Sequence, residues 1–441
     1  MSRLIFHADV NSAFLSWTAV KRLKENPDDV DLRTIPSAIG GSVDDRHGII
    51  TAKSIPAKKY GIVTGEPVVK ALQKCPNLVL AKGDFKIYRE FSRLFISILK
   101  RFSNSVEQVS IDEAFIDMTG FWEKKRNEIK HFDEYQNAND KEKYLEESLK
   151  ESAIKEAEKI KETVFTELGF TINVGISTNK LLAKMASDFE KPYKVHTLFR
   201  NEIQEKMWPL PIGNLFGCGK QTAARLNSLG LRTIGKVARE NEELLCTILG
   251  EKSGEYIHES SNGYGSDKVE PQKEDAKGYS NETTTRFDIT FENYEREMDK
   301  TLQYLCESVS RRLQRDSVFA GTIGVSVKTD LFQRRSKQLK LSDSTNDYEN
   351  ILAISKKLMN ELLLGENGLF SQGYKVRLVG VSATNLDDGQ YRQMNLFDMM
   401  TDTKSEDTKR FDKMQKLKQM SSEINSKFGD KSIYKGKDFF T

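Results

Sequence analysis

Residues 106–120 read VEQVSIDEAFIDMTG, and this stretch decides the fold. Apolar residues alternate along it, which predicts a pair of strands. The alternating positions are Val106, Val109, Ile111, Ala114 and Ile116. The adjacent acids Asp112 and Glu113 would point to opposite faces of a strand, so one of them would face an apolar layer. A buried acid needs a partner, and Mg2+ is a natural one because it prefers hard oxygen ligands.

A third acid lies at the end of another predicted strand. Residues 3–9 read RLIFHAD, a short buried strand that ends at Asp9, and an apolar helix follows over 13–23. A single acid in such a place is more commonly a turn or cap residue. Carboxylates gathered here could instead hold two Mg2+ ions, and the ions would stabilise both the attacking and the leaving oxygen of a phosphoryl transfer.

The rest of the chain predicts an α+β protein of several domains. Before residue 200, strands are predicted at 35–39, 47–52 and 171–177, and helices at 85–102, 122–167 and 178–189. Short helices joined by glycine turns follow over 207–240, and the polar stretch 262–280 is typical of a linker. A βαββαβ order comes next, over 282–290, 293–316, 320–330, 336–342, 347–364 and 374–385. After Asp388 the chain resembles a polar tail.

Composition excludes several classes of protein. The 441 residues are 38% hydrophobic, enough for several packed cores, which excludes one small module and wholesale disorder. No run reaches the roughly 18 uncharged apolar residues of a membrane span. The four separated cysteines indicate free thiols in a reducing, intracellular compartment. The net charge of +3, from 68 basic and 65 acidic residues, argues neither for nor against a nucleic-acid partner.

Four motifs resemble, in order and spacing, the catalytic core of Y-family translesion DNA polymerases, in particular the bacterial polymerase IV and polymerase V catalytic-subunit group. They are HADVNSAF (7–14), GGSVDDRHGIITAKSIPAKKYGI with GEPVVKALQKCPNL (40–78), SIDEAFIDMTG (110–120) and VGISTNKLLAKMASDFEKP (174–192). The resemblance runs from Ile5 to about Gly235 and resumes at 277–285 and 376–384.

The resemblance implies a right-hand polymerase fold with α+β domains. A palm with fingers would span 1–200, with the fingers at about 24–81, and a helix-hairpin-helix-like thumb would span 201–275. A βαββαβ little finger would occupy 282–388, and a C-terminal tail would occupy 389–441.

The same resemblance implies the active site. Asp9, Asp112 and Glu113 would be the catalytic carboxylates and, with the Val10 carbonyl, would bind two Mg2+ ions. Asp9 and Asp112 would bridge both ions, and Glu113 would serve the ion nearer the primer 3′-OH. Phe14 falls at the steric-gate position, where an aromatic ring leaves no room for a ribose 2′-OH.

Two lysines fall where the family binds the triphosphate of the incoming nucleotide: Lys58 in IPAKKYG and Lys180 in STNKLLAK. Here the chain departs from polymerase IV relatives, which tend to carry a Tyr and an Arg in the first motif where this chain has Ile55 and Lys58. Lysine lacks the bidentate fork of arginine. Lys180 follows Asn179 at a predicted helix start, where anions are attracted.

DNA contacts are predicted in two further domains. Glycine turns at Gly217 and Gly219 of the thumb would present N–H groups to phosphates. A basic surface of the little finger is predicted from residues on or beside its strands: Lys328, Arg334, Arg335, Lys337, Lys340, Lys375 and Arg377.

The tail residues Gln393, Leu396 and Phe397 match the Gln-x-x-Leu-Phe peptide with which bacterial polymerases bind the sliding clamp. The predicted partners are therefore primer–template DNA, deoxynucleoside triphosphates and this clamp. The enzyme is expected to be a cytoplasmic, nucleoid-associated monomer without a membrane partner.

Two other readings remain at this point. A catalytically inactive family member could act as a clamp-bound adaptor, although all three carboxylates are present in this chain. A nucleotidyl cyclase could share a palm-like fold, but the thumb, little finger and clamp peptide argue against it.

Overall fold

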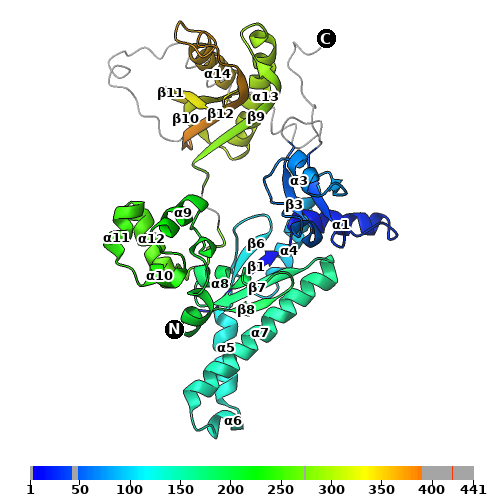
Figure 1. Cartoon of the computed structure of the whole chain (residues 1–441), viewed down its shortest axis with the longest axis vertical. Coiled ribbons are helices and arrows are strands. Elements are labelled where there is room, and N and C mark those ends of the chain that lie inside the picture. Colours follow the sequence, from blue (N-terminus) through cyan, green and yellow to red (C-terminus); the bar gives the residue numbers. More distant parts are fainter. Residues whose placement is uncertain (1–2, 42–47, 273–274, 390–419, 421–441) are drawn as a thin grey trace. The chain divides into compact units, whose positions relative to one another are not determined.

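The computed structural model describes residues 3–41, 48–272, 275–389 and 420. Its internal contacts divide the chain into two compact units, between Asp275 and Ala276. The division falls inside the stretch that was predicted as a linker. In Figure 1 the first unit runs from blue to green and the second from yellow-green to orange.

A five-stranded sheet forms the centre of the first unit. In spatial order its strands are β5 (Val106–Gln108), β6 (Glu113–Asp117), β1 (Ile5–Val10), β7 (Ile172–Ser177) and β8 (Val195–Thr197). The central strand β1 is antiparallel to both neighbours, whereas β7 and β8 are parallel. The strands predicted over 3–9 and 171–177 are confirmed.

The strand pair predicted within 106–120 is confirmed with one correction. Residues 109–112 form the turn between β5 and β6, so Asp112 precedes the strand instead of lying on it. The N–H groups of Val109 and Ser110 both donate to the carbonyl of Glu113, which closes the turn. The side chains of Asp112 and Glu113 therefore do not point to opposite faces of one strand. Asp112 lies in the turn, and Glu113 is the first residue of β6.

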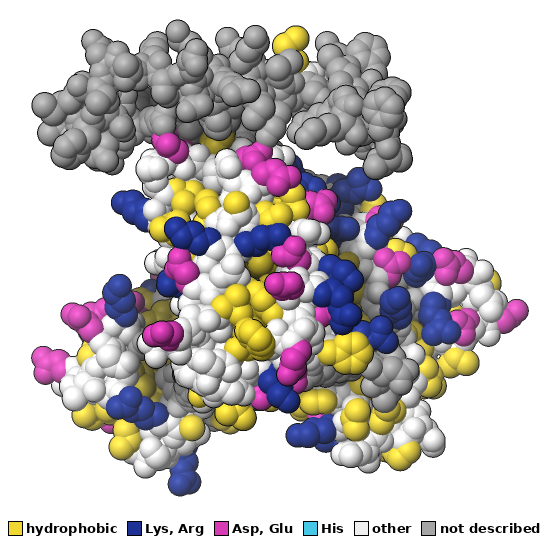
Figure 2. All heavy atoms as spheres, turned by 90° about the horizontal axis from the view of Figure 1, so that it is seen from above, with side chains coloured by type: hydrophobic (Ala, Val, Ile, Leu, Met, Phe, Trp, Pro, Cys, Tyr) yellow, Lys and Arg dark blue, Asp and Glu magenta, His cyan; other side chains and the backbone are white. Residues whose placement is uncertain are grey.

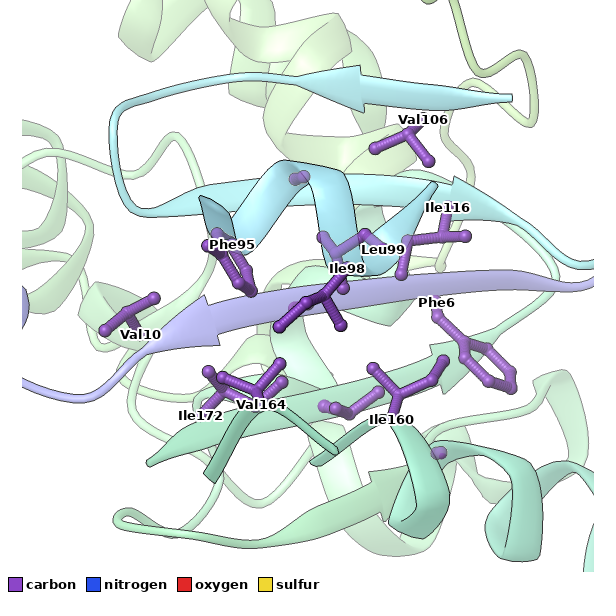
Figure 3. Close-up of a cluster of buried hydrophobic side chains, with 14 of the residues drawn as sticks. Phe6, Val10, Phe95, Ile98, Leu99, Val106, Ile116, Ile160, Val164 and Ile172 are labelled. Atoms are coloured by element: carbon purple, nitrogen blue, oxygen red, sulfur yellow. The ribbon is translucent and has the colours of Figure 1, made fainter. Parts of the chain in front are cut away.

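One face of the sheet is covered by helices α4 (Phe85–Leu99) and α7 (Lys141–Leu168). Side chains alternate along β1, so Phe6 and Val10 join the buried cluster on this side (Figure 3). Burial of one such large side chain stabilises the fold by about 1.5–3 kcal/mol. The remaining side chains of β1, including His7 and Asp9, therefore belong to the opposite face.

That opposite face is approached by helix α8 (Lys180–Ser187), which packs on β7 at Gly175. A Cβ atom at Gly175 would overlap the backbone of the helix, at the carbonyl of Ala183 and the N–H of Ser187. The helix begins at Asn179, whose side chain accepts a hydrogen bond from the Leu182 N–H at 2.8 Å. This close approach places Lys184 of α8 beside Glu113 of β6.

The long helix predicted over 122–167 is three helices instead of one: α5 (Thr119–Lys130), α6 (Asp133–Gln136) and α7. Asp140 caps α7 by accepting a hydrogen bond from the Lys143 N–H, so the chain restarts its helix there. Helix α1 (Ala13–Glu25) connects β1 to the next region.

Residues 24–81 contain a second, three-stranded sheet. Its elements are β2 (Ser37–Gly40), β3 (Ile50–Lys53), α2 (Ile55–Lys58), α3 (Val68–Lys74) and β4 (Val79–Ala81). A small core that includes Ile50, Ile62 and Val68 holds this region together.

Residues 200–261 are helical. The elements are η1 (Arg200–Glu202), η2 (Ile203–Met207), η3 (Ile212–Asn214), α9 (Lys220–Ser228), α10 (Ile234–Ala238), α11 (Glu242–Leu249) and α12 (Glu251–Ser261). Gly217 has φ +84, and a Cβ atom there would meet the ring of Tyr256 at 2.5 Å, so this turn requires glycine.

The second unit has the predicted βαββαβ order. Its elements are β9 (Gly278–Ile289), α13 (Tyr294–Arg315), β10 (Phe319–Thr329), β11 (Arg334–Thr345), α14 (Tyr348–Leu363) and β12 (Val376–Asp387). The strands form one antiparallel sheet in the order β11, β10, β12, β9. Its core contains α13 and α14 with the inward residues of the sheet, such as Ile323, Val325 and Val379.

The stretch 262–280 is not a free linker over its whole length. Val269 is buried against Ile5 and Phe115 of the first unit, and the Glu270 N–H donates to Glu107 at 2.8 Å. The Lys180 N–H also donates to the Ser266 carbonyl at 2.9 Å. The chain is therefore attached to the central sheet well beyond α12.

None of the helices in the described ranges is long and apolar enough to span a membrane.

Candidate active site

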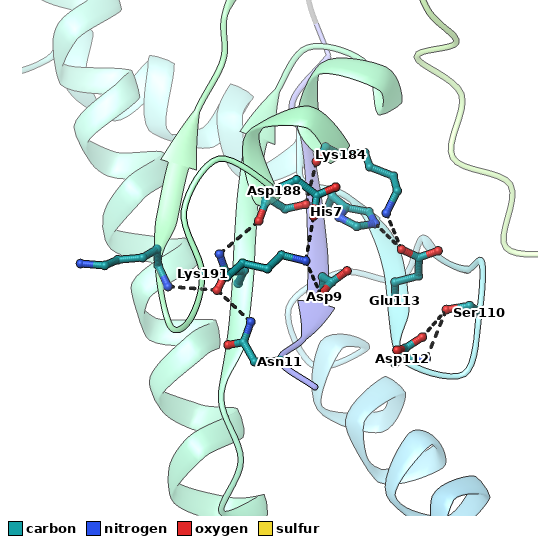
Figure 4. A network of polar contacts seen from close by, with 12 residues as sticks. His7, Asp9, Asn11, Ser110, Asp112, Glu113, Lys184, Asp188 and Lys191 are labelled. Carbon is teal, nitrogen blue, oxygen red and sulfur yellow. Dashed lines mark hydrogen bonds and ion pairs between the residues drawn. The ribbon is translucent and has the colours of Figure 1, made fainter. Parts of the chain in front are cut away.

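The three predicted carboxylates come together at one end of the central sheet. Asp9 and Glu113 are directly opposite each other in the β1–β6 ladder, so their side chains share one face. Asp112 is adjacent in the turn, and its carbonyl accepts the Val10 N–H at 3.0 Å. Figure 4 shows the three side chains at this end of the two strands.

Two lysines neutralise this cluster. Lys191 Nζ lies 2.9 Å from Asp9 Oδ1 and 2.7 Å from Asp188 Oδ1, and Lys184 Nζ lies 2.5 Å from Glu113 Oε2 (Figure 4). Burial opposes the charged form of Lys191, but Asp9 and Asp188 outweigh it and raise the pKa of the ammonium. Both ion pairs show that this site attracts positive charge.

His7 lies buried behind Glu113. Its Nδ1 is 2.8 Å from Ser187 Oγ, and its Nε2 is 3.4 Å from Glu113 Oε2. Burial lowers the pKa of His7. His7 and Lys184 together hold the pKa of the Glu113 carboxyl down at about 2, against the effect of its burial. Glu113 is therefore an anion at every physiological pH.

Asp112 has the opposite shift. Burial and the negative charges of Asp9 and Glu113 raise the pKa of Asp112, although the Ser110 hydroxyl donates to its Oδ1 at 2.6 Å. Carboxylates repel in this way only when they are close together. Lys184 and Lys191 thus neutralise Glu113 and Asp9, whereas the partner of the Asp112 carboxylate is the Ser110 hydroxyl.

This donor set fits a divalent cation. The available atoms are hard carboxylate oxygens and a strand-end carbonyl, as Mg2+ prefers, and the repulsion felt by Asp112 is the kind that a bound cation relieves. In the described parts of the chain, no three His, Cys, Asp or Glu side chains already converge in a metal-binding arrangement. Glu113 and Asp9 instead form ion pairs with Lys184 and Lys191.

Lys180, predicted to bind triphosphate, lies in a different environment. Its Nζ lies 3.0 and 2.9 Å from the two oxygens of Glu107, and 5.5 Å from the centre of the Phe115 ring. The structure thus brings Lys184 and Lys191, and not Lys180, to the carboxylates. All three lysines stand in the motif 174–192, and the helix start at Asn179 had favoured Lys180. Tertiary packing instead brings Lys191, which follows α8, to Asp9.

Lys58 is exposed at the end of α2. The sequence prediction missed its neighbour Lys53. Burial and the charge of Lys58 lower the pKa of Lys53, which indicates that the two lysines are close. Lys53 Nζ donates to Thr64 Oγ1 at 3.1 Å. Two ammonium groups thus lie close together in the region 24–81.

Phe14 is half-buried in the first turn of α1 and belongs to an aromatic group. It stacks on Tyr88 with ring centres 4.6 Å apart and planes within 9°, and it meets Phe85 edge-on at 5.8 Å. The Tyr88 hydroxyl is also 2.8 Å from Thr18 Oγ1. The ring of Phe14 is therefore supported from behind.

The predicted thumb glycines have different surroundings. Gly217 is fixed by its positive φ and by Tyr256, whose hydroxyl donates to the Phe216 carbonyl at 3.1 Å. Gly219 precedes α9 as its N-cap, and no atom lies within 4 Å of where its Cβ would be. The first N–H groups of a helix have no acceptor within that helix, as the predicted phosphate contact at the start of α9 requires.

The predicted basic surface of the little finger is divided by the register of the sheet. Lys328 pairs with Arg334, so these two share the face opposite the helices. Arg335 pairs with the buried Val327 and therefore belongs to the helix side, where its neighbour Lys337 forms an ion pair with Glu361 of α14. Arg334 and Arg335 are thus not on one surface, which corrects the prediction of a single stripe.

The other basic residues predicted on that surface differ in their contacts. Lys328 and Arg377 both lie over the ring of the exposed Phe332, at 5.9 and 5.1 Å from its centre. Arg334 forms an ion pair with Glu282 at 2.9 Å, and Lys375 is exposed. The clamp-peptide residues Gln393, Leu396 and Phe397 lie outside the described residues.

Comparison with known proteins identifies the family of this chain. Residues 8–188 match the model of the impB/mucB/samB family, and residues 276–396 match that of the impB/mucB/samB family C-terminal domain. The chain is 39% identical to DNA polymerase IV of Clostridium acetobutylicum, over 98% of this chain and 97% of that protein. It is 31% identical to DNA polymerase IV 1 of Bacillus subtilis, over 99% of this chain and 93% of that one.

A solved Y-family DNA polymerase chimera has the same fold, with a TM-score of 0.69 and 22% identity, covering 87% of this chain and 98% of that one. The fold and the carboxylate site together define a Y-family DNA polymerase with palm, fingers, thumb and little finger, which is a DNA-directed DNA polymerase. Within that class, the chain belongs to the impB/mucB/samB family.

Proposed function

We propose that this polymerase extends a primer 3′-OH past damaged template bases, with low fidelity, by Mg2+-dependent phosphoryl transfer. The observation that carries the proposal is the convergence of Asp9, Asp112 and Glu113 at the ends of β1 and β6. The ion pairs of Asp9 with Lys191 and of Glu113 with Lys184 could open to let the carboxylates bind a cation. These carboxylates and the Val10 carbonyl would hold two Mg2+ ions, which supply charge neutralisation at the reacting oxygens when bound.

Lys191 and Lys184 would then also be able to bind the triphosphate of the incoming nucleotide. If Asp9 held a cation, Lys191 would lose its contact with Asp9 at 2.9 Å and keep the ion pair with Asp188 at 2.7 Å, so its remaining N–H donors could bind a triphosphate oxygen. Lys184 can move from Glu113 in the same way. Lys58 and Lys53 remain further candidates for the triphosphate, and Lys180, which pairs with Glu107, is the less favoured one.

Other residues orient the substrates. Phe14, stacked on Tyr88, would exclude a ribose 2′-OH as the steric gate. Gly217, Gly219 and the bases Lys328, Arg334, Lys375 and Arg377 would hold the DNA backbone, with Arg335 less well placed. The peptide Gln393–Phe397 would bind the sliding clamp, and the enzyme would act as a monomer at the nucleoid in the cytoplasm.

The alternative of an inactive clamp-bound adaptor predicts no need for the carboxylates. Asp112→Asn and Glu113→Gln should each reduce Mg2+-dependent primer extension by roughly 100-fold or more, with DNA affinity preserved. Glu90→Gln, on the exposed side of α4, is the matched control and should extend primers normally. Wild-type-like extension by either active-site variant would exclude the two-metal proposal, and inactive wild-type enzyme would favour the adaptor.

A further inference from the structure

A groove on the palm is lined by positive side chains that the catalytic site does not use. It lies between the exposed side of α4 and the turn that joins β5 to β6, and its volume is about 570 Å3. Its cations are Arg89, Arg93 and Lys100, all exposed. No described residue forms an ion pair with any of the three, and no acid is among the lining residues.

The three cations form a line. Positions 89, 93 and 100 lie within roughly 40° of one another around an α-helix that advances about 1.5 Å per residue. The line is therefore on the order of 16 Å long. The opposite side of α4 is in the core through Phe91, Phe95 and Ile98, which fixes the cations on the outside. A row of separated charges suits a chain of phosphates better than one small anion.

The other wall is the segment Gln108–Ile111, which leads directly into Asp112. Gln108 Nε2 donates to Ser92 Oγ at 3.0 Å and joins the two walls. The wall adds the polar Ser110 and the half-exposed Val109, and no aromatic side chain lines the groove. Stacking of bases is therefore not favoured, whereas contact with sugars and phosphates is.

The groove adjoins the catalytic site at both walls. Ser110 of the turn donates to Asp112, and Tyr88, one residue before Arg89, stacks on Phe14. A polyanion in the groove would therefore pass beside the reacting end of the substrate. An acidic protein segment also carries negative charge, but the groove has no aromatic side chain, and its apolar lining is limited to Ile96, Val109 and Ile111, whereas aromatic anchors are enriched at protein interfaces.

We infer that this palm groove binds the sugar-phosphate backbone of a DNA strand next to the active site, independently of sequence, as a grip additional to the thumb and the little finger. Arg89, Arg93 and Lys100 neutralise phosphates, and the hydroxyl of Ser97 lies between them along the helix.

The first test is the salt dependence of binding by the full chain. Its affinity for a labelled primer–template with a single-stranded template extension is measured by fluorescence anisotropy at several salt concentrations. In the variant Arg89→Ala/Arg93→Ala, two lost phosphate contacts should reduce the slope of log affinity against log salt by about 1.5. Affinity at 0.1 M salt should fall about tenfold, and kcat at saturating DNA should stay within about twofold.

Two controls isolate the groove. Lys130→Ala/Lys143→Ala removes the same charge from exposed positions of α5 and α7 and should leave the slope unchanged. Arg89→Lys/Arg93→Lys keeps the charge and should retain most of the slope. Equal slopes for the alanine variant and the wild type would overturn the inference, as would an equal loss in the α5–α7 control.

A second measurement detects the contact itself. Ser97→Cys, in a Cys246→Ser background that removes the partly exposed cysteine, is mixed with duplexes that carry a thiol tether at single phosphates. A disulfide to one strand, at a few consecutive phosphates, is expected and identifies that strand. Absence of any crosslink, or occupation of the groove by an acidic peptide without competition from DNA, would contradict the inference.

Discussion

The residues of the active site differ in how far their environment perturbs them. Glu113 is held as an anion by His7 and Lys184, whereas the neighbouring Asp112 is destabilised by the charges of Asp9 and Glu113. Two adjacent carboxylates thus have pKa values shifted in opposite directions. An incoming cation would gain most from Asp112, where no lysine ammonium is in contact in the described structure.

The lysines can be separated by their effect on nucleotide binding. Lys191→Ala should raise KM for the incoming nucleotide by about tenfold or more, because one charge-assisted contact is worth about 1.5–3 kcal/mol. Lys180→Ala, whose ion pair is with Glu107, should change KM little. Steady-state kinetics at saturating DNA measure both. A large effect of Lys180 with none of Lys191 would reverse this assignment.

The gate can be tested at Phe14. Phe14→Ala should increase incorporation of ribonucleotides relative to deoxynucleotides by at least about tenfold, because space opens below the sugar. Tyr88→Phe keeps the stacked ring and loses only the hydroxyl contact to Thr18, so its sugar selectivity should remain as in the wild type. Single-nucleotide insertion with matched pairs of substrates gives the ratio. Unchanged selectivity of Phe14→Ala would remove the gate role.

At the scale of elements, the alternating pattern of 106–120 identified both strands but not the turn between them. Hydrogen bonds from Val109 and Ser110 to the Glu113 carbonyl close that turn, and their formation depends on the chain reversing there. The strand predicted over 336–342 also began too late to include Arg334 and Arg335, which alternate between the two faces of β11. Pairing with β10 decides which of the two faces the helices.

The polar composition of the segment after α12 predicted a free linker, but its residue Val269 is buried against the central sheet. Val269→Asp should destabilise the first unit by about 2–3 kcal/mol, because it places a charge between Ile5 and Phe115. Thermal unfolding should show a lower Tm for the variant. Gln272→Asp, at an exposed position of the same segment, is the control and should unfold like the wild type. Equal Tm values for Val269→Asp and the wild type would mean that the attachment is unimportant.

At the scale of the whole molecule, the net charge of +3 conceals opposed regional charges. Acids are concentrated at the carboxylate cluster of Asp9, Asp112 and Glu113, and bases line the palm groove and the open face of the little finger. Such local surfaces give a DNA affinity that depends strongly on salt. A tether to a clamp would compensate for that weakness.

The tether is tested in the C-terminal tail. Leu396→Ala/Phe397→Ala should abolish binding to the sliding clamp and shorten clamp-dependent products, because both apolar anchors are lost. Distributive synthesis without the clamp should be unchanged. Met394→Ala/Asn395→Ala alters the two variable positions of the same peptide and should bind normally. Binding to immobilised clamp and product-length analysis measure the two effects, and retained binding by the first variant would refute the tether.

The sequence by itself determined the α+β class, most strands and helices, the βαββαβ order of the second unit and the three carboxylates. These follow from short-range periodicity and from motifs whose residues are close along the chain. The tertiary structure alone decided which lysine reaches Asp9, which face of the little-finger sheet Arg334 and Arg335 each occupy, and that Val269 is buried. Each of these depends on pairing or packing between residues far apart in sequence, for which local alternation and spacing carry no information.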